Sequence, residues 1–219
     1  MKLITIDGPS ASGKGTVSQR VAEILGWDVL DSGALYRLSA LACLNLSTDL
    51  KNIQDVVSVI KNMQINFCDG LVFLNSNNVT DAIRTEHVGN VAAQLATIPE
   101  VRKALVNLQH SFLKEKGLVA DGRDMGTVIF PQAPLKIFLI SDIETRALRR
   151  FNQIKDKNPN ITLDAIRNDM RKRDEQDRNR SIAPLVAAKD AITIDTTSMS
   201  IDEVVNFIIQ KWKILEKFS

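Results

Sequence analysis

The stretch Gly8-Pro9-Ser10-Ala11-Ser12-Gly13-Lys14-Gly15-Thr16 decides how this chain folds. It follows a short apolar run at residues 3–6 and precedes apolar residues at helical spacing, Val17, Val21 and Ile24, so it joins a strand to a helix. A glycine-rich loop in that position is typical of phosphate binding. Its glycines let the backbone turn several N–H groups toward one anion, and the following helix adds its positive end.

Two side chains of this loop suit a nucleoside triphosphate. Lys14 supplies an ammonium group for the outer phosphates, and the hydroxyl of Thr16 can bind Mg²⁺. The general pattern has Ser or Thr directly after the lysine, whereas Gly15 intervenes here, a variant that favours small-molecule phosphotransferases. The alternative is a glycine-rich turn that binds nothing, but strand, glycines, lysine and helix follow in the order that a phosphate loop requires.

The composition is that of an ordinary soluble protein of 219 residues, long enough for one well-buried core. Its 28 basic and 26 acidic residues give a net charge of +2, so no overall electrostatic field would attract nucleic acid or a membrane.

The cysteines and the first residues bear on the compartment. Cys43 and Cys68 lack metal-ligand spacing, and so few cysteines are typical of reduced thiols in a cytosol. The first apolar run ends at Asp7, too early for a signal peptide or a membrane span. We expect a cytoplasmic monomer that binds small molecules.

Short apolar runs alternate with helical patterns along most of the chain. The runs that read as core strands lie at residues 3–6, 27–30, 117–121, 135–140 and 191–195. Strands that alternate with helices predict a parallel α/β sheet, in which ligands bind beyond the carboxyl ends of the strands. Polar residues gather at three of those ends, at 8–16, 31–37 and 121–124. The sequence therefore predicts one binding crevice at that edge of the sheet.

Between the second and third of these strands the pattern changes. Apolar and polar residues alternate at 65–73, which predicts a small antiparallel insertion. Residues 83–97 and 100–116 then read as two helices separated at Pro99. An insertion of this size is too short to fold alone, so we expect a single domain.

The segment from residue 144 to residue 180 carries eleven Lys or Arg and seven Asp or Glu. It reads as two helices and a turn, and Arg173, Asp177 and Arg180 share one face of the second helix. One interpretation is a solvated helix laced with ion pairs. Another is a mobile lid whose guanidinium groups close over phosphate. RNA binding is a third, although Phe151 is the segment's only aromatic residue.

The residues favour phosphoryl transfer over hydrolysis. His87 and His110 stand apart, so neither a Ser-His-Asp set nor a zinc cluster can be assembled around them. Phosphoryl transfer needs the donor's γ-phosphate, Mg²⁺ and the acceptor oxygen in line, with cations around the equatorial oxygens. A phosphate monoester has a second pKa of about 6, so as an acceptor it is ionised at neutral pH and needs no general base.

Four motifs together closely resemble the bacterial cytidylate kinase family: the loop at 8–16, DSGALYR at 31–37, DGRDMGT at 121–127 and RDEQDRNRSIAPL at 173–185. The resemblance runs essentially end to end. It implies an α/β nucleoside-monophosphate kinase fold, a five-stranded parallel sheet with flanking helices, an antiparallel NMP-binding insertion and an arginine-rich helical lid. It implies transfer of the γ-phosphoryl group of ATP to CMP or dCMP. The single domain would comprise a core at 1–60, 86–145 and 185–219, an insertion at about 62–85 and a lid at about 150–184.

The resemblance also implies roles for single residues. By this resemblance, the acceptor's phosphate would be bound by Arg37, Arg123 and Arg180. Its base would be bound by Ser32, Arg102 and Asp124, and its ribose by Arg173 and Asp177. Those that would act on the transferred group are Lys14, Arg123, Arg178 and Arg180, and residues 8–16 would bind ATP. Tyr36, in the first turn of its helix, can point at a ligand in the same crevice.

Two aspartates after the third strand have chemical reasons of their own. Asp124 can accept a hydrogen bond from the exocyclic amine of cytosine, where uracil presents an oxygen. Asp121 can reach Mg²⁺ through a water beside Thr16. Helix capping or an ion pair with Arg123 is the alternative for both. Two other functions stay open: a kinase of another acceptor, such as UMP or a coenzyme precursor, and a non-catalytic nucleotide-dependent protein that binds RNA or a partner.

Overall fold

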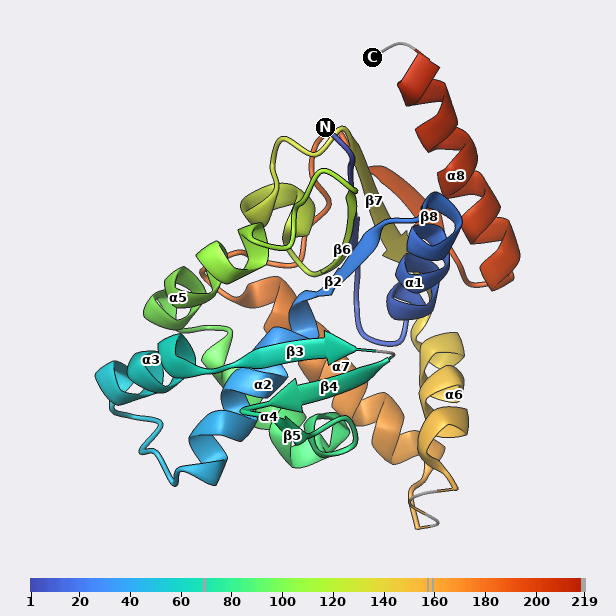
Figure 1. Ribbon diagram of the computed structural model, residues 1–219. Helices are drawn as coiled ribbons and strands as arrows, with labels where there is room; N and C mark the ends of the chain where they lie inside the picture. The colour runs from blue at the N-terminus through green and yellow to red at the C-terminus, as the bar shows by residue number, and fades with distance from the viewer. Residues whose placement is uncertain (69, 157, 159, 218–219) are drawn as a thin grey trace. The chain divides into compact units, whose positions relative to one another are not determined.

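The computed structural model describes residues 1–68, 70–156, 158 and 160–217 (Figure 1). The chain divides into two compact units: Met1–Leu30 with Phe112–Ser219, here called the core unit, and Asp31–Ser111, here called the small unit. The division into core, insertion and lid that the sequence predicts stays a prediction. Within the described residues, no helix combines the length and the apolar character needed to cross a membrane.

The core unit is built on a five-stranded parallel sheet with the strand order β2-β6-β1-β7-β8. The strands are β1 (Leu3–Asp7), β2 (Asp28–Asp31), β6 (Leu118–Gly122), β7 (Leu135–Ile140) and β8 (Ile192–Asp195). In the middle, Ile4 of β1 lies opposite Val119 of β6 and Leu135 of β7. Every residue of β1 is buried, as expected for a parallel strand covered on both faces. The predicted α/β fold with a five-stranded parallel sheet is confirmed.

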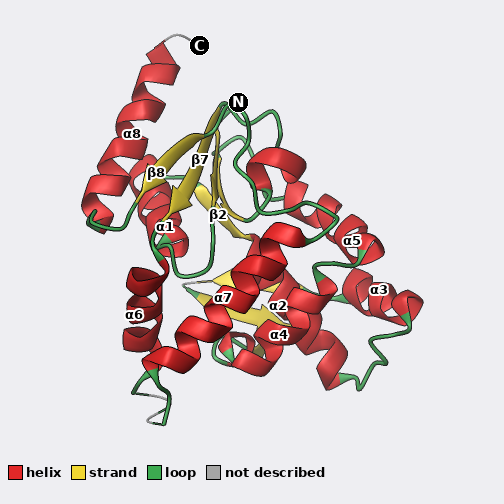
Figure 2. Cartoon of the chain, turned by 180° about the vertical axis from the view of Figure 1, so that it is seen from behind, coloured by secondary structure: helices red, strands yellow, loops and turns green. Residues whose placement is uncertain are grey.

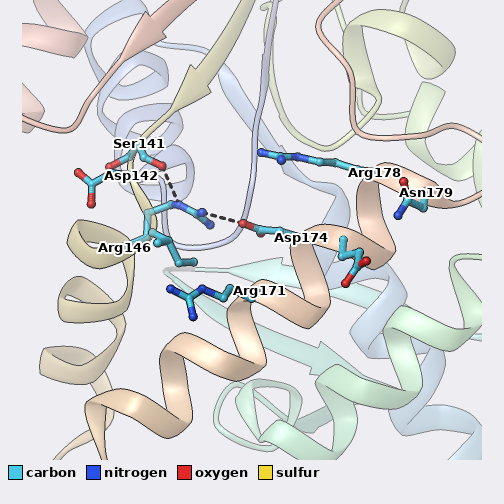
Figure 3. A pocket seen from close by; sticks show the side chains of 9 residues that line it. Ser141, Asp142, Arg146, Arg171, Asp174, Arg178 and Asn179 are labelled. Atoms are coloured by element: carbon cyan, nitrogen blue, oxygen red, sulfur yellow. Dashed lines mark hydrogen bonds and ion pairs between the residues drawn. The ribbon is translucent and has the colours of Figure 1, made fainter.

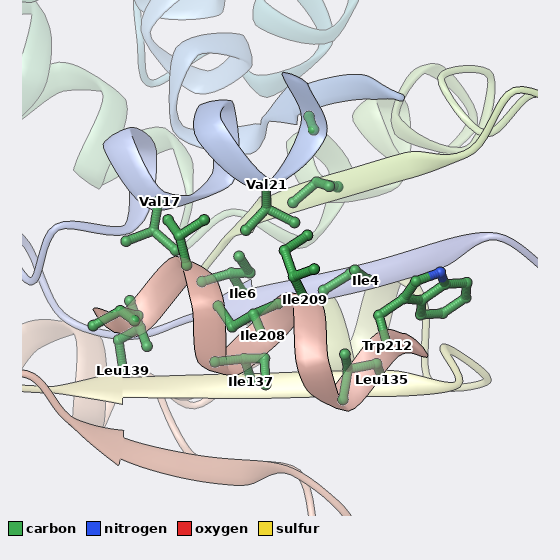
Figure 4. Close-up of a cluster of buried hydrophobic side chains, with 14 of the residues drawn as sticks. Ile4, Ile6, Val17, Val21, Leu135, Ile137, Leu139, Ile208, Ile209 and Trp212 are labelled. Atoms are coloured by element: carbon green, nitrogen blue, oxygen red, sulfur yellow. The ribbon is translucent and has the colours of Figure 1, made fainter. Parts of the chain in front are cut away.

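Two helices, α1 (Lys14–Leu25) and α8 (Ile201–Lys217), cover the sheet and enclose the main apolar cluster of the core unit. Figure 4 shows Val17 and Val21 of α1 and Trp212 of α8 meeting the side chains of the central strands. Ile24, the third residue of the apolar pattern that predicts this helix, lies outside the cluster, because its side chain is 58% exposed. The buried stripe ends instead on Leu25, which packs against the cluster.

The arginine-rich segment forms two consecutive helices, α6 (Ile143–Ile154) and α7 (Leu163–Asn179), as the sequence predicts (Figure 2). Asp142 caps α6 by accepting a hydrogen bond from the N–H of Thr145 at 2.7 Å, and Thr162 caps α7. A small cluster around Ala147, Ile166 and Met170 holds the helices together. Whether they move as a lid stays a prediction.

The small unit contains the antiparallel insertion that the alternating pattern predicts. Its elements are α2 (Ser32–Asn45), α3 (Ile53–Asn62), β3 (Ile65–Cys68), β4 (Leu71–Leu74), β5 (Asn77–Asn78), the 3-10 turn η1 (Ala82–Arg84), α4 (Glu86–Leu95) and α5 (Pro99–His110). The strands form one antiparallel sheet in the order β3-β4-β5.

Two helices of the small unit are shorter than expected. The helix predicted at 83–97 begins only at Glu86, because Thr85 caps α4 and accepts a hydrogen bond from the N–H of Val88. The helix predicted at 100–116 ends at His110. The chain beyond it belongs to the core unit, where Gly117 (φ 113°) passes so close to Trp27 that a Cβ atom would lie 2.5 Å from the ring.

Candidate functional site

The predicted phosphate loop forms the turn between β1 and α1. Gly8 has a φ of 151°, and a Cβ atom there would lie 2.3 Å from the backbone oxygen of Leu139 on β7, so only glycine fits. Ala11 (φ 56°) and Gly13 (φ 92°) also have left-handed backbones, and such turns direct N–H groups toward one side. α1 begins at Lys14 and adds the positive end of its dipole. The loop therefore has the backbone geometry of an anion-binding turn.

Side chains brace this loop from inside. The Nζ of Lys14 donates to the backbone oxygen of Pro9 at 2.8 Å, and the Oγ of Ser12 donates to the same oxygen at 3.0 Å. The side chain of Thr16 is exposed. A Cβ atom on Gly15 would lie 3.6 Å from Oδ2 of Asp121, so this carboxylate lies beside the residue that precedes Thr16.

Asp7, which the sequence analysis did not single out, ends β1 directly before the loop. Its side chain is buried and accepts hydrogen bonds from the N–H groups of Met125 at 2.9 Å and Gly126 at 2.8 Å. Burial raises the pKa of this carboxyl to about 6, although the two hydrogen bonds oppose the rise; the charge of Asp124 adds to it and that of Lys14 opposes it. Asp7 thus holds the π-helical turn η2 (Met125–Ile129) against the central strand.

The raised pKa of Asp7 predicts a stability that depends on pH. In the unfolded chain this carboxyl ionises near pH 4 and in the folded chain near pH 6. The folded state therefore binds more protons within that window, and the free energy of unfolding falls as the pH rises through it, by about 3 kcal/mol for a pKa difference of about 2. Asp7→Asn should remove this contribution. In urea denaturation from pH 4 to pH 7, the wild-type value minus the variant value should fall; a constant or rising difference would contradict the assignment.

A buried arginine joins the loop to the arginine-rich helices. Arg146 on α6 donates from Nη1 to the backbone oxygen of Ser10 at 3.3 Å, from Nε to that of Ser141 at 3.0 Å, and from Nη2 to Oδ2 of Asp174 on α7 at 2.6 Å. A pocket of about 550 Å³ opens beside this pair, lined by the start of α6 and by α7. Figure 3 shows Arg146 between Ser141 and Asp174, and Arg178 of α7 as another side chain that lines the pocket.

The burial of this pair predicts a large loss of stability when one partner is removed. Asp174→Ala leaves the guanidinium of Arg146 buried without its carboxylate, which should lower the free energy of unfolding by about 3 kcal/mol. Asp164→Ala is the matched control on the same helix, because Asp164 is 80% exposed beside Arg167 and should cost less than about 1 kcal/mol. Urea denaturation of both variants measures the contrast, and equal losses would contradict it.

The segment after β6 carries paired charges that reach α7. The Nε of Arg123 donates to Oδ2 of Asp177 at 2.9 Å, and Nη2 of Arg180 lies 3.6 Å from Oδ1 of Asp124. Burial disfavours the charged form of Arg123, but the charge and hydrogen bond of Asp177 outweigh it, so the pKa of Arg123 is raised. Burial and the neighbouring charge of Arg123 lower the pKa of Arg173, whose Nε has no hydrogen-bond partner among the described residues. Guanidinium groups are thus concentrated here.

The remaining predicted residues lie in the small unit. Ser32 begins α2 and donates from Oγ to Oε1 of the buried Gln109 at 2.8 Å. Arg37 donates from Nη1 to the backbone oxygen of Ile83 at 2.6 Å. The guanidinium carbon of Arg102 lies 6.0 Å from the ring centre of Tyr36, within the range of a cation–π contact. The four side chains come from α2 and α5.

The core-unit candidates lie in three places: in the loop with Lys14 and Thr16, at the end of β6 with Asp121, Arg123 and Asp124, and on α7 with Arg173, Asp177 and Arg178. The prediction that Arg180 shares the helix face of Arg173 and Asp177 is wrong, because α7 ends at Asn179 and Arg180 follows it with an extended backbone. Four residues have contacts here but no role predicted from the sequence: Asp7, Arg146, Asp174 and Gln109. For Asp7 a signal existed, because it is a charged residue at the carboxyl end of an apolar strand beside the phosphate loop.

Comparisons with known proteins identify the family of the chain. The family model "Cytidylate kinase" matches residues 4–214. Proteins called cytidylate kinase from Colwellia psychrerythraea and Azotobacter vinelandii are each 48% identical, over 94% and 95% of this chain and 94% of each relative. The solved structure of an uncharacterized protein from Eubacterium ventriosum has a TM-score of 0.51 at 15% identity, covering 96% of this chain and 97% of that one, which shows a shared fold alone. The family model and the relatives together establish that the chain belongs to the cytidylate kinase family.

Proposed function

We propose that this phosphotransferase moves the γ-phosphoryl group of ATP to CMP or dCMP, giving ADP and CDP or dCDP. One observation carries the proposal: the core unit contains both a phosphate loop braced by Lys14 and two arginines held by carboxylates. Arg123 is held by Asp177, and Arg180 lies beside Asp124. A phosphoryl group in transfer gathers negative charge on its equatorial oxygens, and fixed cations stabilise that charge. Membership of the cytidylate kinase family supports CMP as the acceptor.

For the donor, we infer that residues 8–16 bind the phosphates of ATP and that the pocket bordered by Arg178 receives a further part of the nucleotide. Mg²⁺ prefers oxygen ligands and keeps several waters, so it needs few protein groups. Thr16 and Asp121 fit this requirement, because the Asp121 carboxylate lies beside Gly15 and the Thr16 side chain is exposed. Bound Mg²⁺ would neutralise the developing charge on the donor phosphates.

For the acceptor, we propose that the arginines bind the phosphate, that polar side chains recognise the base, and that an arginine–aspartate pair binds the ribose. The phosphate would be bound by Arg37, Arg123 and Arg180. The base would be recognised by Ser32, Arg102 and Asp124, and the ribose would be bound by Arg173 and Asp177. The buried Nε of Arg173 has no hydrogen-bond partner among the described residues, which supports a ligand there, because a buried donor without a partner costs stability. Tyr36 would border the same ligand. Because the acceptor phosphate is already ionised at neutral pH, Lys14, Arg123, Arg178 and Arg180 need only position and neutralise charge.

We further infer a monomer that acts in the cytoplasm on small molecules, without nucleic acid or a membrane as partner. The near balance of 28 basic and 26 acidic residues supports the absence of a general attraction to polyanions. The sequence has only two cysteines, Cys43 and Cys68, and so few are typical of a protein in a reducing compartment.

The proposed function is tested by steady-state release of ADP from MgATP with CMP, dCMP, UMP and a non-nucleotide acceptor. The wild-type protein should turn over CMP or dCMP with the highest kcat/KM. Asp124→Asn should lower the ratio of kcat/KM for CMP to that for UMP by about tenfold or more, because an amide cannot replace a carboxylate as a pure acceptor for the cytosine amine. Fastest turnover of UMP or of the non-nucleotide would refute the acceptor, and an unchanged ratio would remove Asp124 from base recognition.

A further inference from the structure

Asp7 connects two parts of the proposed site. It immediately precedes Gly8, the first residue of the phosphate loop, and its two carboxylate oxygens accept hydrogen bonds from Met125 and Gly126. Those residues directly follow Asp124. A single buried carboxylate, 4% exposed, therefore ties the start of the donor loop to the residue proposed to recognise the base.

The turn that Asp7 binds depends on outside support. Met125–Ile129 is a single π-helical turn, an uncommon backbone conformation that is frequent at functional sites. The N–H groups of Val128 and Ile129 both bond to the backbone oxygen of Asp124, so this turn starts at Asp124 itself. The first N–H groups of a helical turn have no acceptor within it, and Asp7 supplies acceptors for two of them.

The close approach of the turn to β1 is also built into the sequence. A Cβ atom on Gly126 would lie 2.9 Å from Oγ1 of Thr5, 3.2 Å from Cδ of Lys136 and 3.4 Å from Oδ2 of Asp7. Any other residue at 126 would force these side chains or the backbone of the turn to shift. The contact between the turn and β1 thus uses both residues: Asp7 supplies the hydrogen-bond acceptors, and Gly126 supplies the space for the close approach.

We propose that Asp7 is a positioning residue for acceptor selection, which sets the direction of the Asp124 side chain by anchoring the turn that begins there. This inference rests on the proposed function. In this proposal Asp7 acts through the turn and not through a contact with the acceptor. When the hydrogen bonds from the turn to Asp7 are lost, Asp124 can take up several orientations. The preference for CMP over UMP should therefore fall by a larger factor than the affinity for ATP.

Two variants and one control test the inference. Asp7→Asn replaces one acceptor by a donor that faces an N–H group, and Gly126→Ala keeps the carboxylate but displaces the backbone. Ile4→Val is the control, because Ile4 is a buried residue of the same strand whose side chain belongs to the apolar cluster with α1 and α8, which includes no residue of the turn. Amide hydrogen exchange of the ligand-free protein is the first readout. The amides of residues 125 and 126 should exchange about tenfold faster or more in both variants, and at the wild-type rate in the control.

The second readout is the ratio of kcat/KM for CMP to that for UMP. It should fall by about tenfold in both variants, while the KM for ATP changes by less than about threefold. Equal losses of CMP and UMP turnover would overturn the inference, because a merely structural role predicts them, and so would unchanged exchange at residues 125 and 126. If Asp7→Asn does not fold, Gly126→Ala decides by the same readouts. If the wild-type protein does not phosphorylate CMP, the proposed function fails, whereas the exchange readout still decides whether Asp7 holds the turn.

Discussion

Replacing Lys14 with alanine is expected to lower kcat/KM for CMP phosphorylation by about 10³-fold. The ammonium of Lys14 is buried at the centre of the loop, where it donates to the backbone oxygen of Pro9. A fixed cation in a site that excludes water stabilises charge on the transferred phosphoryl group far more than the same cation in water would. Most of the loss should lie in kcat, because charge on the equatorial oxygens grows toward the transition state.

Arg20→Ala is the control for this experiment. Arg20 lies on the same helix and carries the same charge, but it forms an exposed ion pair with Asp202. The control should keep its activity and lose less than about 1 kcal/mol of unfolding free energy. If Lys14→Ala keeps more than about a tenth of the wild-type rate, the loop does not act on the donor as proposed. A separate outcome, RNA binding by a wild-type protein that has no detectable transferase activity, would favour the non-catalytic alternative.

Replacing Arg123 with alanine should lower kcat/KM for CMP by about 10²- to 10³-fold, through loss of a charge-assisted contact to the acceptor phosphate. It should also destabilise the fold by about 1–3 kcal/mol, because the carboxylate of Asp177, which is only 16% exposed, loses its partner. Initial rates over a range of CMP concentrations and urea denaturation measure the two effects separately.

The double variant Arg123→Ala with Asp177→Ala separates structure from function. Removing both charges should restore most of the stability, because no buried carboxylate is left without a partner, but it should not restore activity. Arg167→Ala is the control on α7, where Arg167 pairs with Glu144 and Asp164 away from Arg123. If the double variant regained CMP turnover, Arg123 would have a structural role alone.

The order of elements could be predicted from the sequence because it depends on local signals. The apolar run at 135–140 coincides with β7, and the polar cluster at 31–33 starts a helix because Asp31 accepts a hydrogen bond from the N–H of Ala34. Gly8 and Gly13 marked the loop because their backbones need conformations or space that other residues lack. Such signals lie within a few residues of the structure that they predict.

What could not be predicted depends on contacts between distant parts of the chain. Arg146 bonds to Ser10 across 136 residues, and Asp7 bonds to Met125 across 118. A helical pattern alone could not show that α5 stops at His110, because the residues that follow carry no glycine or proline until Gly117. The first two N–H groups of the π-helical turn likewise donate to Asp7, which lies far away in the sequence at the end of β1.

Transfer of radiolabel from [γ-³²P]ATP in the presence of Mg²⁺ and CMP tests most directly whether this site moves a phosphoryl group to a nucleoside monophosphate. We predict that the label appears in CDP, that omitting CMP leaves it in ATP, and that Lys14→Ala nearly abolishes the transfer. Label released only as inorganic phosphate, or retained in ATP with active wild-type protein and CMP present, would contradict the central claim.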